Sequence, residues 1–287
     1  VGAEVMGLYQ LIMPVYSVLL SLTAVGLTSA VSNLTSQHLA LGSRRAADQT
    51  ISACLKIFFL LLLLGMAGVM CARDAILFLL AWEIMSLAPF FLIDFNDGDS
   101  KVRDASWVYL VAAHLGAVFL LAFFVLLWQV TGTTALTTAA CAPLADAGTG
   151  TLSTLFLLAV AGFGAKAGVA PLHVWLPEAH PAAPSHVSAL LSGAMINAGL
   201  YGLLRSLALL GGAPSAGVLG GLPEWWGWFL RLLGRATALL GILKALGQGN
   251  LKRLLAYSSV ENMGLMFMGV GAGLLGVATG DAWTALL

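Results

Sequence analysis

Apolar residues run through this chain in long continuous stretches, separated by short segments rich in polar residues, glycine or proline. The stretch IFFLLLLLGMAGVM at 57–70 shows no alternation of polar and apolar positions, whereas a strand of a membrane barrel alternates. A helix needs about 20 apolar residues to cross a bilayer, so the pattern predicts an all-α polytopic transmembrane helix bundle with about eight spans. The expected spans are 8–33, 51–72, 75–95, 105–130, 152–170, 185–210, 225–248 and 254–276.

The composition agrees with this pattern and narrows the partners. Of 287 residues, 60% are hydrophobic and 9% are charged, against about 25% charged residues in soluble domains. The net charge is zero, so nothing predicts nucleic-acid binding, and the lipid bilayer is the expected surrounding. Positive charge concentrates in the loops 34–50, 95–104 and 249–253. If the spans alternate in direction, these loops share the cytoplasmic side, which predicts a multi-pass protein of the cell inner (plasma) membrane.

Tryptophans near the ends of predicted spans are expected at the membrane interfaces. They are Trp107, Trp128, Trp175, Trp225, Trp226 and Trp228.

No cysteine or histidine spacing predicts a bound metal ion or cofactor. The three cysteines are scattered in or beside apolar stretches without a CxxC pair, so neither a haem nor an iron–sulfur site is expected. His173, His180 and His186 follow one another at spacings of seven and six, with prolines between them, which does not form a ligand pair on one helix. A histidine titrates near neutral pH, so His173 is a candidate for proton relay.

Glu83 lies in the middle of the apolar stretch AILFLLAWEIMSLAPFFLI, with no other charged residue between Asp74 and Asp94. A charge at mid-bilayer costs at least about 3 kcal/mol, so a residue kept there needs a role. Glu83 is either a hydrogen-bonded structural glutamate or a proton site, and we favour the proton site.

Lys166 lies in LFLLAVAGFGAKAGVAPLHVWLP, with glycines close to it and Pro171 after it. Glycine weakens and proline interrupts the hydrogen-bond ladder of a helix, so one broken helix is expected here. Broken helices form ion sites in membrane transporters, and a lysine at such a break can change its charge with its surroundings. The alternative is a lysine that snorkels at a helix end; we favour the ion site.

Three further residues are candidates for proton translocation, each with an open alternative. Lys244 lies near a predicted helix end, where it either acts inside the membrane or snorkels to its surface. His114, in VYLVAAHLGAVFL, either passes protons in the bundle interior or hydrogen-bonds a neighbouring backbone group. Glu261, early in the last span, is either interfacial or extends a polar axis from Lys244.

Three segments carry a resemblance to a known family: LFLLAWEIMSLAPFFLI, GFGAKAGVAPLHVWLPEAHPAAPSHVSALLSGAM and GQGNLKRLLAYSSVENMG. Over residues 66–287 the chain resembles the antiporter-like, proton-translocating membrane subunits of NADH:quinone oxidoreductase, Mrp-type cation/proton antiporters and membrane-bound hydrogenases. The ending SSVENMG favours the hydrogenase branch, near hydrogenase 4 component B and the formate hydrogenlyase membrane subunit.

The resemblance implies two inverted repeats, each with a broken helix that carries a central lysine. By motif position, Lys166 is that lysine and Glu83 is the glutamate that pairs with it. The resemblance also implies that proximity to Glu83 keeps Lys166 charged, and that separating the pair releases a proton onward. The expected partners are other membrane and peripheral subunits of a respiratory or hydrogenase complex, which would supply redox energy because this chain is expected to carry no redox site.

The chain departs from the family pattern in two places. Asn197, in GAMINAGLYG, stands where many relatives have a lysine or histidine, which puts the proton path between the repeats in doubt. Asn197 could hold a water there, and Lys244 could supply a compensating charge. The chain ends at Leu287, before a second broken helix, so 59–287 is expected to hold the first repeat and the start of a truncated second one.

The beginning of the chain does not resemble that family. Within 1–58, GAEVMGLYQLIMPVYS is similar to the start of polysaccharide-export and spore-cortex lipid-flippase proteins. A natural fusion, a constructed chimera and a joining artefact are the alternatives, and we favour the artefact. The first residue is Val1 rather than Met, so we expect a fragment, and two helices are too few to flip a lipid.

The leading hypothesis is a proton-translocating membrane subunit of an energy-converting oxidoreductase complex, of the hydrogenase or NADH:quinone type, acting through a buried Glu83–Lys166 pair. A standalone cation/proton antiporter and a non-functional truncated fusion are the alternatives. A flippase is disfavoured because it needs more helices than the chain offers.

Overall fold

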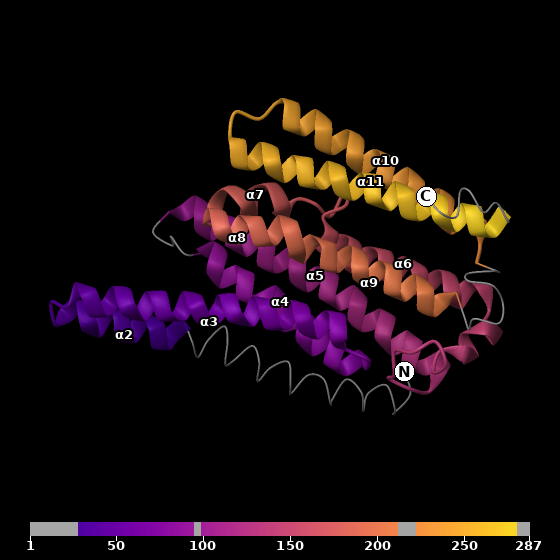
Figure 1. Ribbon diagram of the computed structural model, residues 1–287, viewed down its shortest axis with the longest axis horizontal. Coiled ribbons are helices and arrows are strands. Elements are labelled where there is room, and N and C mark those ends of the chain that lie inside the picture. The colour runs from indigo at the N-terminus through magenta and orange to yellow at the C-terminus, as the bar shows by residue number, and fades with distance from the viewer. Residues whose placement is uncertain (1–27, 95–98, 212–221, 280–287) are drawn as a thin grey trace.

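The protein is a bundle of long helices (Figure 1). The computed structural model describes residues 28–94, 99–211 and 222–279, and these ranges contain helices and turns but no β-strand. The predicted all-α class is therefore confirmed. The helices are α2 (Thr28–Ala40), α3 (Arg44–Cys71), α4 (Ala75–Ile93), α5 (Ser100–Thr131), α6 (Thr149–Ala167), α7 (Trp175–Ala182), α8 (Ser185–Leu190), α9 (Ile196–Leu210), α10 (Glu224–Leu246) and α11 (Leu251–Thr279), with a 3-10 turn at Ala142–Asp146 and a π-helical turn at Leu191–Met195.

Six helical segments are long and apolar enough to cross a membrane, and they correspond to six of the predicted spans. They are Arg44–Cys71, Ala75–Ile93, Ser100–Thr131, Thr149–Ala167, Ser185–Leu210 and Leu251–Ala278. The predicted first span, 8–33, lies almost entirely outside the described residues. The predicted span 225–248 is helical as α10, but it is not among the six, and Arg231 and Arg235 interrupt its apolar run.

The helices pack in groups that follow the order of the chain (Figure 1). Helices α3 and α4 form an antiparallel pair, α6 packs between α5 and α9, and α10 and α11 form a second antiparallel pair. The α10–α11 pair contacts the middle group through α7. The α2–α3 turn, the start of α5 and the α10–α11 turn lie at the same end of the bundle, which is the arrangement that the three basic loops predicted.

The helix that carries Lys166 breaks where the glycine and proline pattern predicts. Helix α6 ends one residue after Lys166, and Gly168 follows in the left-handed conformation, with φ +76°, which glycine adopts at little cost. The chain becomes helical again at Trp175. The indole nitrogen of Trp175 donates a hydrogen bond to the Ala165 carbonyl oxygen (2.8 Å), so the two sides of the break are fixed to each other.

Helix α10 provides a second attachment for the break. The buried hydroxyl of Thr237 accepts a hydrogen bond from the backbone N–H of Ala170 (3.1 Å) and donates one to the Leu233 carbonyl oxygen (2.7 Å). A backbone N–H without a partner is costly inside a membrane. Thr237 therefore stabilises the non-helical segment that follows Lys166.

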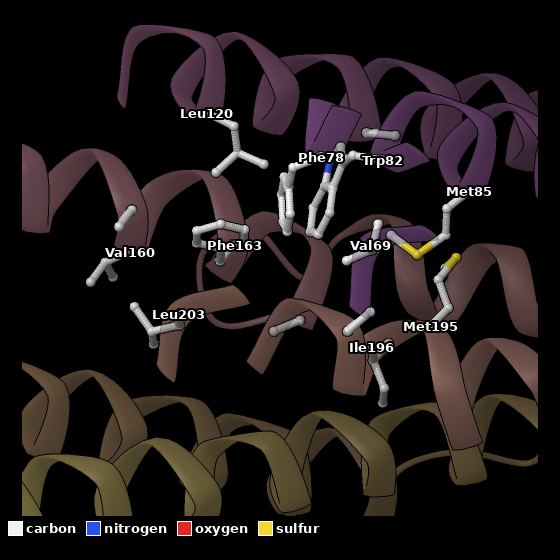
Figure 2. Packing of buried hydrophobic residues seen from close by; sticks show 14 of the residues in the cluster. Val69, Phe78, Trp82, Met85, Leu120, Val160, Phe163, Met195, Ile196 and Leu203 are labelled. Carbon is white, nitrogen blue, oxygen red and sulfur yellow. The ribbon is translucent and has the colours of Figure 1, made fainter. Parts of the chain in front are cut away.

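Aromatic side chains of α4 and α6 form the centre of the core (Figure 2). Phe78 and Trp82 of α4 meet the ring of Phe163 of α6 edge-on, with ring centroids 6.0 Å and 5.4 Å apart. Helix α9 approaches Phe163 so closely that a Cβ atom added at Gly202 would clash with the Phe163 ring. The Phe163 ring therefore contacts both α4 and α9.

Two of the tryptophans predicted at the membrane interfaces are core residues instead. Trp175 is buried beside the break, where it hydrogen-bonds to Ala165. Trp226 is buried and stacks on Phe156 with ring centroids 4.3 Å apart. The prediction was wrong for these two because the end of a span can lie against another helix as well as against the lipid headgroups.

Candidate functional site

Lys166 is buried in the last turn of α6, with 3% of its surface exposed. Its ammonium nitrogen Nζ donates hydrogen bonds to the Ser86 hydroxyl oxygen (2.9 Å) and to the Tyr109 hydroxyl oxygen (3.0 Å). It also lies 5.9 Å from the ring centroid of Trp82 and 5.2 Å from that of Tyr109. Hydrogen-bond acceptors and aromatic faces both stabilise a cation, so the surroundings of Lys166 stabilise its ammonium group.

Glu83 is buried in the middle of α4, with 8% of its surface exposed. Its Oε2 atom is buried without a hydrogen-bond partner. The carboxyl interacts electrostatically with both His114 and Lys166. Within the described residues Glu83 and Lys166 do not form a direct ion pair, for which an N···O distance of 4.0 Å or less is needed. The two charges are therefore neighbours in the interior without being in contact.

Tyr109 connects the lysine to α4 and to the π-helical turn. Its hydroxyl donates a hydrogen bond to the backbone carbonyl oxygen of Ser86 (2.8 Å) and lies 3.6 Å from the Met195 sulfur. Met195 is the last residue of the π-helical turn that joins α8 to α9, and such turns are frequent at functional sites. Tyr109, Ser86 and Met195 are all buried, so the neighbours of Lys166 are shielded from water.

His114 lies half-buried on α5 and completes the charged group around Glu83. Its Nδ1 atom is 2.9 Å from the Leu110 carbonyl oxygen. A carbonyl oxygen only accepts hydrogen bonds, so Nδ1 carries the proton in this contact and a neutral ring has Nε2 as its acceptor. Of the two alternatives for His114, the structure shows the hydrogen bond to a neighbouring backbone group, and the ring also interacts electrostatically with the buried glutamate.

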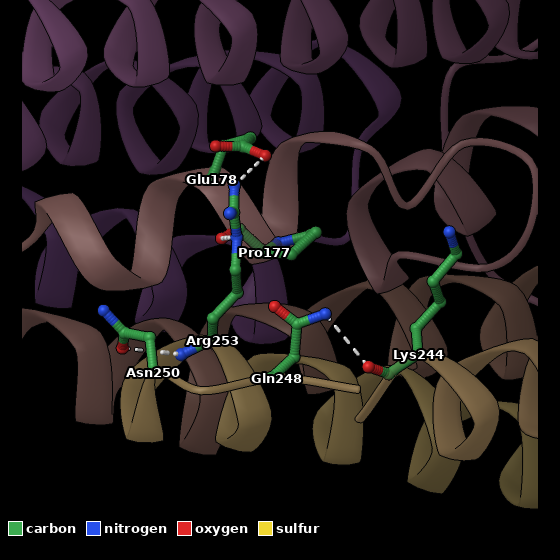
Figure 3. A network of polar contacts seen from close by, with 6 residues as sticks. All are labelled: Pro177, Glu178, Lys244, Gln248, Asn250 and Arg253. Atoms are coloured by element: carbon green, nitrogen blue, oxygen red, sulfur yellow. Dashed lines mark hydrogen bonds and ion pairs between the residues drawn. The ribbon is translucent and has the colours of Figure 1, made fainter. Parts of the chain in front are cut away.

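Lys244 and His173 form a separate pair, and His173 lies in the non-helical segment of the break. The two side chains interact electrostatically, and a buried Nδ1 of His173 has no hydrogen-bond partner. Lys244 itself is exposed near the end of α10, where its backbone oxygen accepts a hydrogen bond from the Gln248 side chain (3.0 Å; Figure 3). The structure therefore does not place Lys244 in the buried interior.

The two remaining candidates lie apart from the Glu83–Lys166 neighbourhood. The Asn197 side chain is half-buried and donates a hydrogen bond to the Gly193 carbonyl oxygen (2.7 Å), one turn earlier in the same segment. Glu261 is half-buried on α11, where the backbone of α10 approaches closely at Gly241. Among the described residues, moreover, no group of three His, Cys, Asp or Glu side chains could hold a metal ion.

A polar clamp ties the start of α11 to α7 (Figure 3). Arg253 forms an ion pair with Glu178 and donates a hydrogen bond to the Pro177 carbonyl oxygen (3.3 Å). Lys252 donates to the Ala183 carbonyl oxygen (2.8 Å). Asn250 caps α11 by accepting hydrogen bonds from the backbone N–H groups of Lys252 and Arg253 (2.9 and 3.3 Å). The clamp joins the α10–α11 pair to the segment that follows the break.

The family of the chain follows from its sequence. Residues 72–286, which include Glu83, Tyr109, His114 and Lys166, match the family model described as NADH:quinone oxidoreductase/Mrp antiporter, TM. The chain belongs to this family. Membership confirms the resemblance that the three sequence segments indicated, and with the six membrane-spanning segments it confirms a multi-pass membrane protein.

Two curated relatives are similar to most of this chain. Hydrogenase-4 component B of Escherichia coli (strain K12) is 38% identical over 231 residues, covering 80% of this chain and 33% of the relative. Formate hydrogenlyase subunit 3 of the same organism is 39% identical over 219 residues, covering 74% and 32%. The chain spans about a third of the length of these curated relatives.

A solved structure is also similar. It belongs to the membrane-bound sulfane sulfur reductase, an archaeal respiratory membrane complex, and superposes with a TM-score of 0.67 at 28% sequence identity. The superposition covers 75% of this chain and 42% of that one. The relatives of this antiporter-family chain are thus subunits of larger membrane complexes.

The sequence reasoning missed the two residues that contact Lys166 directly. Ser86 is three positions after Glu83, so a helical reading of 75–95 would have placed both on one face of α4. No comparable signal pointed to Tyr109, since a tyrosine in an apolar stretch is an ordinary core residue. Its role depends on the packing of α5 against α4 and α7.

Proposed function

We propose that this chain carries out proton translocation as part of an antiporter-like membrane subunit of an energy-converting oxidoreductase complex, of the hydrogenase or NADH:quinone type, in the plasma membrane. The observation that carries the proposal is the placement of Glu83 and Lys166, two buried ionisable groups of opposite sign, beside a helix break inside the helix bundle. Buried charges are rare inside membranes and accompany ion and proton pathways.

The proposed mechanism is electrostatic. Opposite charges 4 Å apart attract by about 4 kcal/mol at an effective dielectric constant near 20, which corresponds to about a thousandfold change in proton affinity. Closing the Glu83–Lys166 pair would therefore keep the lysine protonated, and opening it would let the lysine give up its proton. The described contacts agree with an open arrangement, because Lys166 bonds to Ser86 and Tyr109 and not to Glu83.

His114 is the proposed neighbour in the proton path. It interacts with the same carboxyl group as Lys166, and its ring can accept a proton at Nε2 while Nδ1 stays bonded to Leu110. In the proposal His114 exchanges protons with Glu83, the carboxyl group with which it interacts.

The energy for opening the pair would come from partner subunits, both membrane-embedded and peripheral. The similar proteins named above are components of a hydrogenase and of a formate hydrogenlyase, and part of a respiratory complex. In the proposal this chain supplies the ionisable groups and the low-dielectric surroundings, while electron transfer takes place elsewhere in the complex.

Proton uptake by liposomes that contain the complete host complex tests the proposal. We expect Lys166→Ala and Glu83→Gln to abolish redox-driven proton uptake while the complex still assembles and transfers electrons. The matched controls are Lys101→Ala and Glu224→Gln, which remove the same charges from exposed positions at helix starts, and these should pump normally. Unchanged pumping in both test variants would mean that the buried charges are structural.

The same preparation decides between this proposal and a cation/proton exchanger, an activity that the Mrp part of the family description suggests. If the full-length protein purified without partners exchanges cations for protons in liposomes, the exchanger is correct. If uptake requires both the redox substrates and the partner subunits, the oxidoreductase subunit is correct.

A further inference from the structure

Lys166 has two different sets of partners. The first set is the neutral oxygen acceptors of Ser86 and Tyr109, at 2.9 Å and 3.0 Å from Nζ. The second is Glu83, which interacts with Lys166 electrostatically and has a buried oxygen without a hydrogen-bond partner. The lysine occupies the first set in this structure, although a carboxylate is the stronger acceptor.

The neutral acceptors are held in place by three different elements. The Tyr109 hydroxyl donates a hydrogen bond to the Ser86 carbonyl oxygen, so a lone pair of its oxygen remains to accept the hydrogen bond from Lys166. The Tyr109 ring packs edge-on against Trp175, with ring centroids 5.2 Å apart. The Trp175 indole in turn donates a hydrogen bond to the Ala165 carbonyl oxygen in the last turn of α6. The acceptor site is therefore built from α4, α5 and the segment after the break.

Glu83 and one of the two neutral partners, Ser86, lie one helical turn apart on α4. Glu83 and Ser86 are three residues apart on the same helix, which places them on one face with a rise of about 4.5 Å between them. A lysine side chain has four rotatable methylene groups. Over such a spacing a change of the lysine rotamer, rather than a displacement of α4 or α6, would carry Nζ from one partner to the other.

We propose that Ser86 and Tyr109 form a resting site that holds the Lys166 ammonium group away from Glu83, so that they are positioning residues for proton translocation. This inference rests on the proposed function. The resting site competes with the carboxylate for the lysine, and this competition makes the ion pair able to open. Without the two hydroxyl groups, the carboxylate is the remaining strong acceptor, and the pair stays closed.

Tyr109→Phe tests the resting site because it removes the hydroxyl and keeps the ring that packs against Trp175. Ser86→Ala removes the second acceptor, and Ser86→Thr restores a hydroxyl at the same position. We expect Tyr109→Phe and Ser86→Ala each to lower redox-driven proton uptake by the assembled host complex about tenfold, since a hydrogen bond to a charged group is lost. Ser86→Thr should retain most of the uptake.

Matched controls separate the loss of a hydroxyl at this site from the loss of a hydroxyl as such. Tyr201→Phe removes a tyrosine hydroxyl that donates to the Met70 carbonyl oxygen (3.0 Å), and Ser206→Ala removes a buried serine hydroxyl that donates to the Gly202 carbonyl oxygen (2.9 Å). Neither contacts Lys166, and both should pump like the unaltered complex.

A structural readout identifies positioning directly. An electron cryomicroscopy map of the Tyr109→Phe, Ser86→Ala double variant of the host complex should show Nζ of Lys166 within ion-pair distance of Glu83. If Nζ stays away from Glu83, or if Tyr109→Phe and Ser86→Ala both pump normally, the resting site is wrong. If Tyr109→Phe does not assemble, the comparison of Ser86→Ala with Ser86→Thr decides in the same way.

Lys166→Ala in the same series keeps the two proposals distinguishable. If it abolishes pumping while the hydroxyl variants pump normally, the proposed function stands and the resting site falls. If Lys166→Ala itself pumps normally, the proposed function falls, and the resting site falls with it.

Discussion

Lys166 and Lys244 both lie near the ends of helices in apolar sequence, yet Lys166 is buried and Lys244 is exposed. Lys166 ends α6 inside the bundle, where a break, two hydroxyl groups and two aromatic rings surround it. Lys244 ends α10 at the surface of the described part of the chain. The difference shows that an apolar run alone does not determine whether a lysine is buried: Lys166 is covered by side chains of α4 and α5, whereas Lys244 is exposed.

The two lysines should differ most in their contribution to proton translocation. Lys166→Ala should lower proton translocation by the host complex by a factor of about 100 or more, as expected for a group that carries the transferred proton. Lys244→Ala should lower it less than about threefold, because an exposed lysine is readily replaced by water. Proton uptake by proteoliposomes measures both. Equal losses in the two variants would contradict the division into a buried and a surface lysine.

The second prediction concerns packing around the two lysines. Gly202→Ala should destabilise the protein by about 1–3 kcal/mol, since the added Cβ atom forces the Phe163 ring and with it α6 to move. Gly249→Ala, in the turn that follows Lys244, should cost much less, because nothing lies within 4 Å of the added atom. Thermal unfolding of the purified full-length protein in detergent compares them. A larger loss for Gly249→Ala would refute the assignment of tight packing to α6 and α9.

The third prediction compares the helix starts. Asp74 caps α4 by accepting from the N–H groups of Ile76 and Leu77 and also accepts a hydrogen bond from the Thr134 hydroxyl. Asn250 caps α11 through the two hydrogen bonds that it accepts from the backbone N–H groups of Lys252 and Arg253. Asp74→Ala should therefore cost more than Asn250→Ala, at roughly 2 and 1 kcal/mol respectively. The same unfolding measurement tests this order, and the reverse order would mean that the Thr134 contact adds nothing.

The smallest expected effect lies in the clamp that joins the two regions. The Arg253 and Glu178 side chains are 37% and 44% exposed, and ion pairs with such access to water are worth about 1 kcal/mol or less. A double-mutant cycle with Arg253→Gln and Glu178→Gln should give a coupling energy in that range, which decreases at high salt. A coupling energy of several kcal/mol would show that the clamp is a principal connection.

The sequence predicted the helices, the break and the two buried charges for clear physical reasons. Continuous apolar stretches have few alternatives in a membrane, and glycines with Pro171 beside Lys166 mark an interrupted helix. The surroundings of Lys166 could not be predicted, because Ser86 and Tyr109 come from other helices and meet the lysine only through tertiary packing. For the same reason, the hydropathy of the surrounding sequence did not predict that Trp175 is buried or that Lys244 is exposed.

Glu83 and Ser86 are one turn apart on a helix long enough to cross the membrane, so a charge that moves between them moves along the transmembrane electric field. A displacement equal to the helical rise between the two residues, about 4.5 Å, is roughly one seventh of a hydrocarbon core that is about 30 Å thick. A potential of 100 mV would then bias the two lysine positions by only about 0.3 kcal/mol. Voltage alone would leave both positions populated, and a proton-motive force that builds up during turnover would do little to stop the lysine from moving.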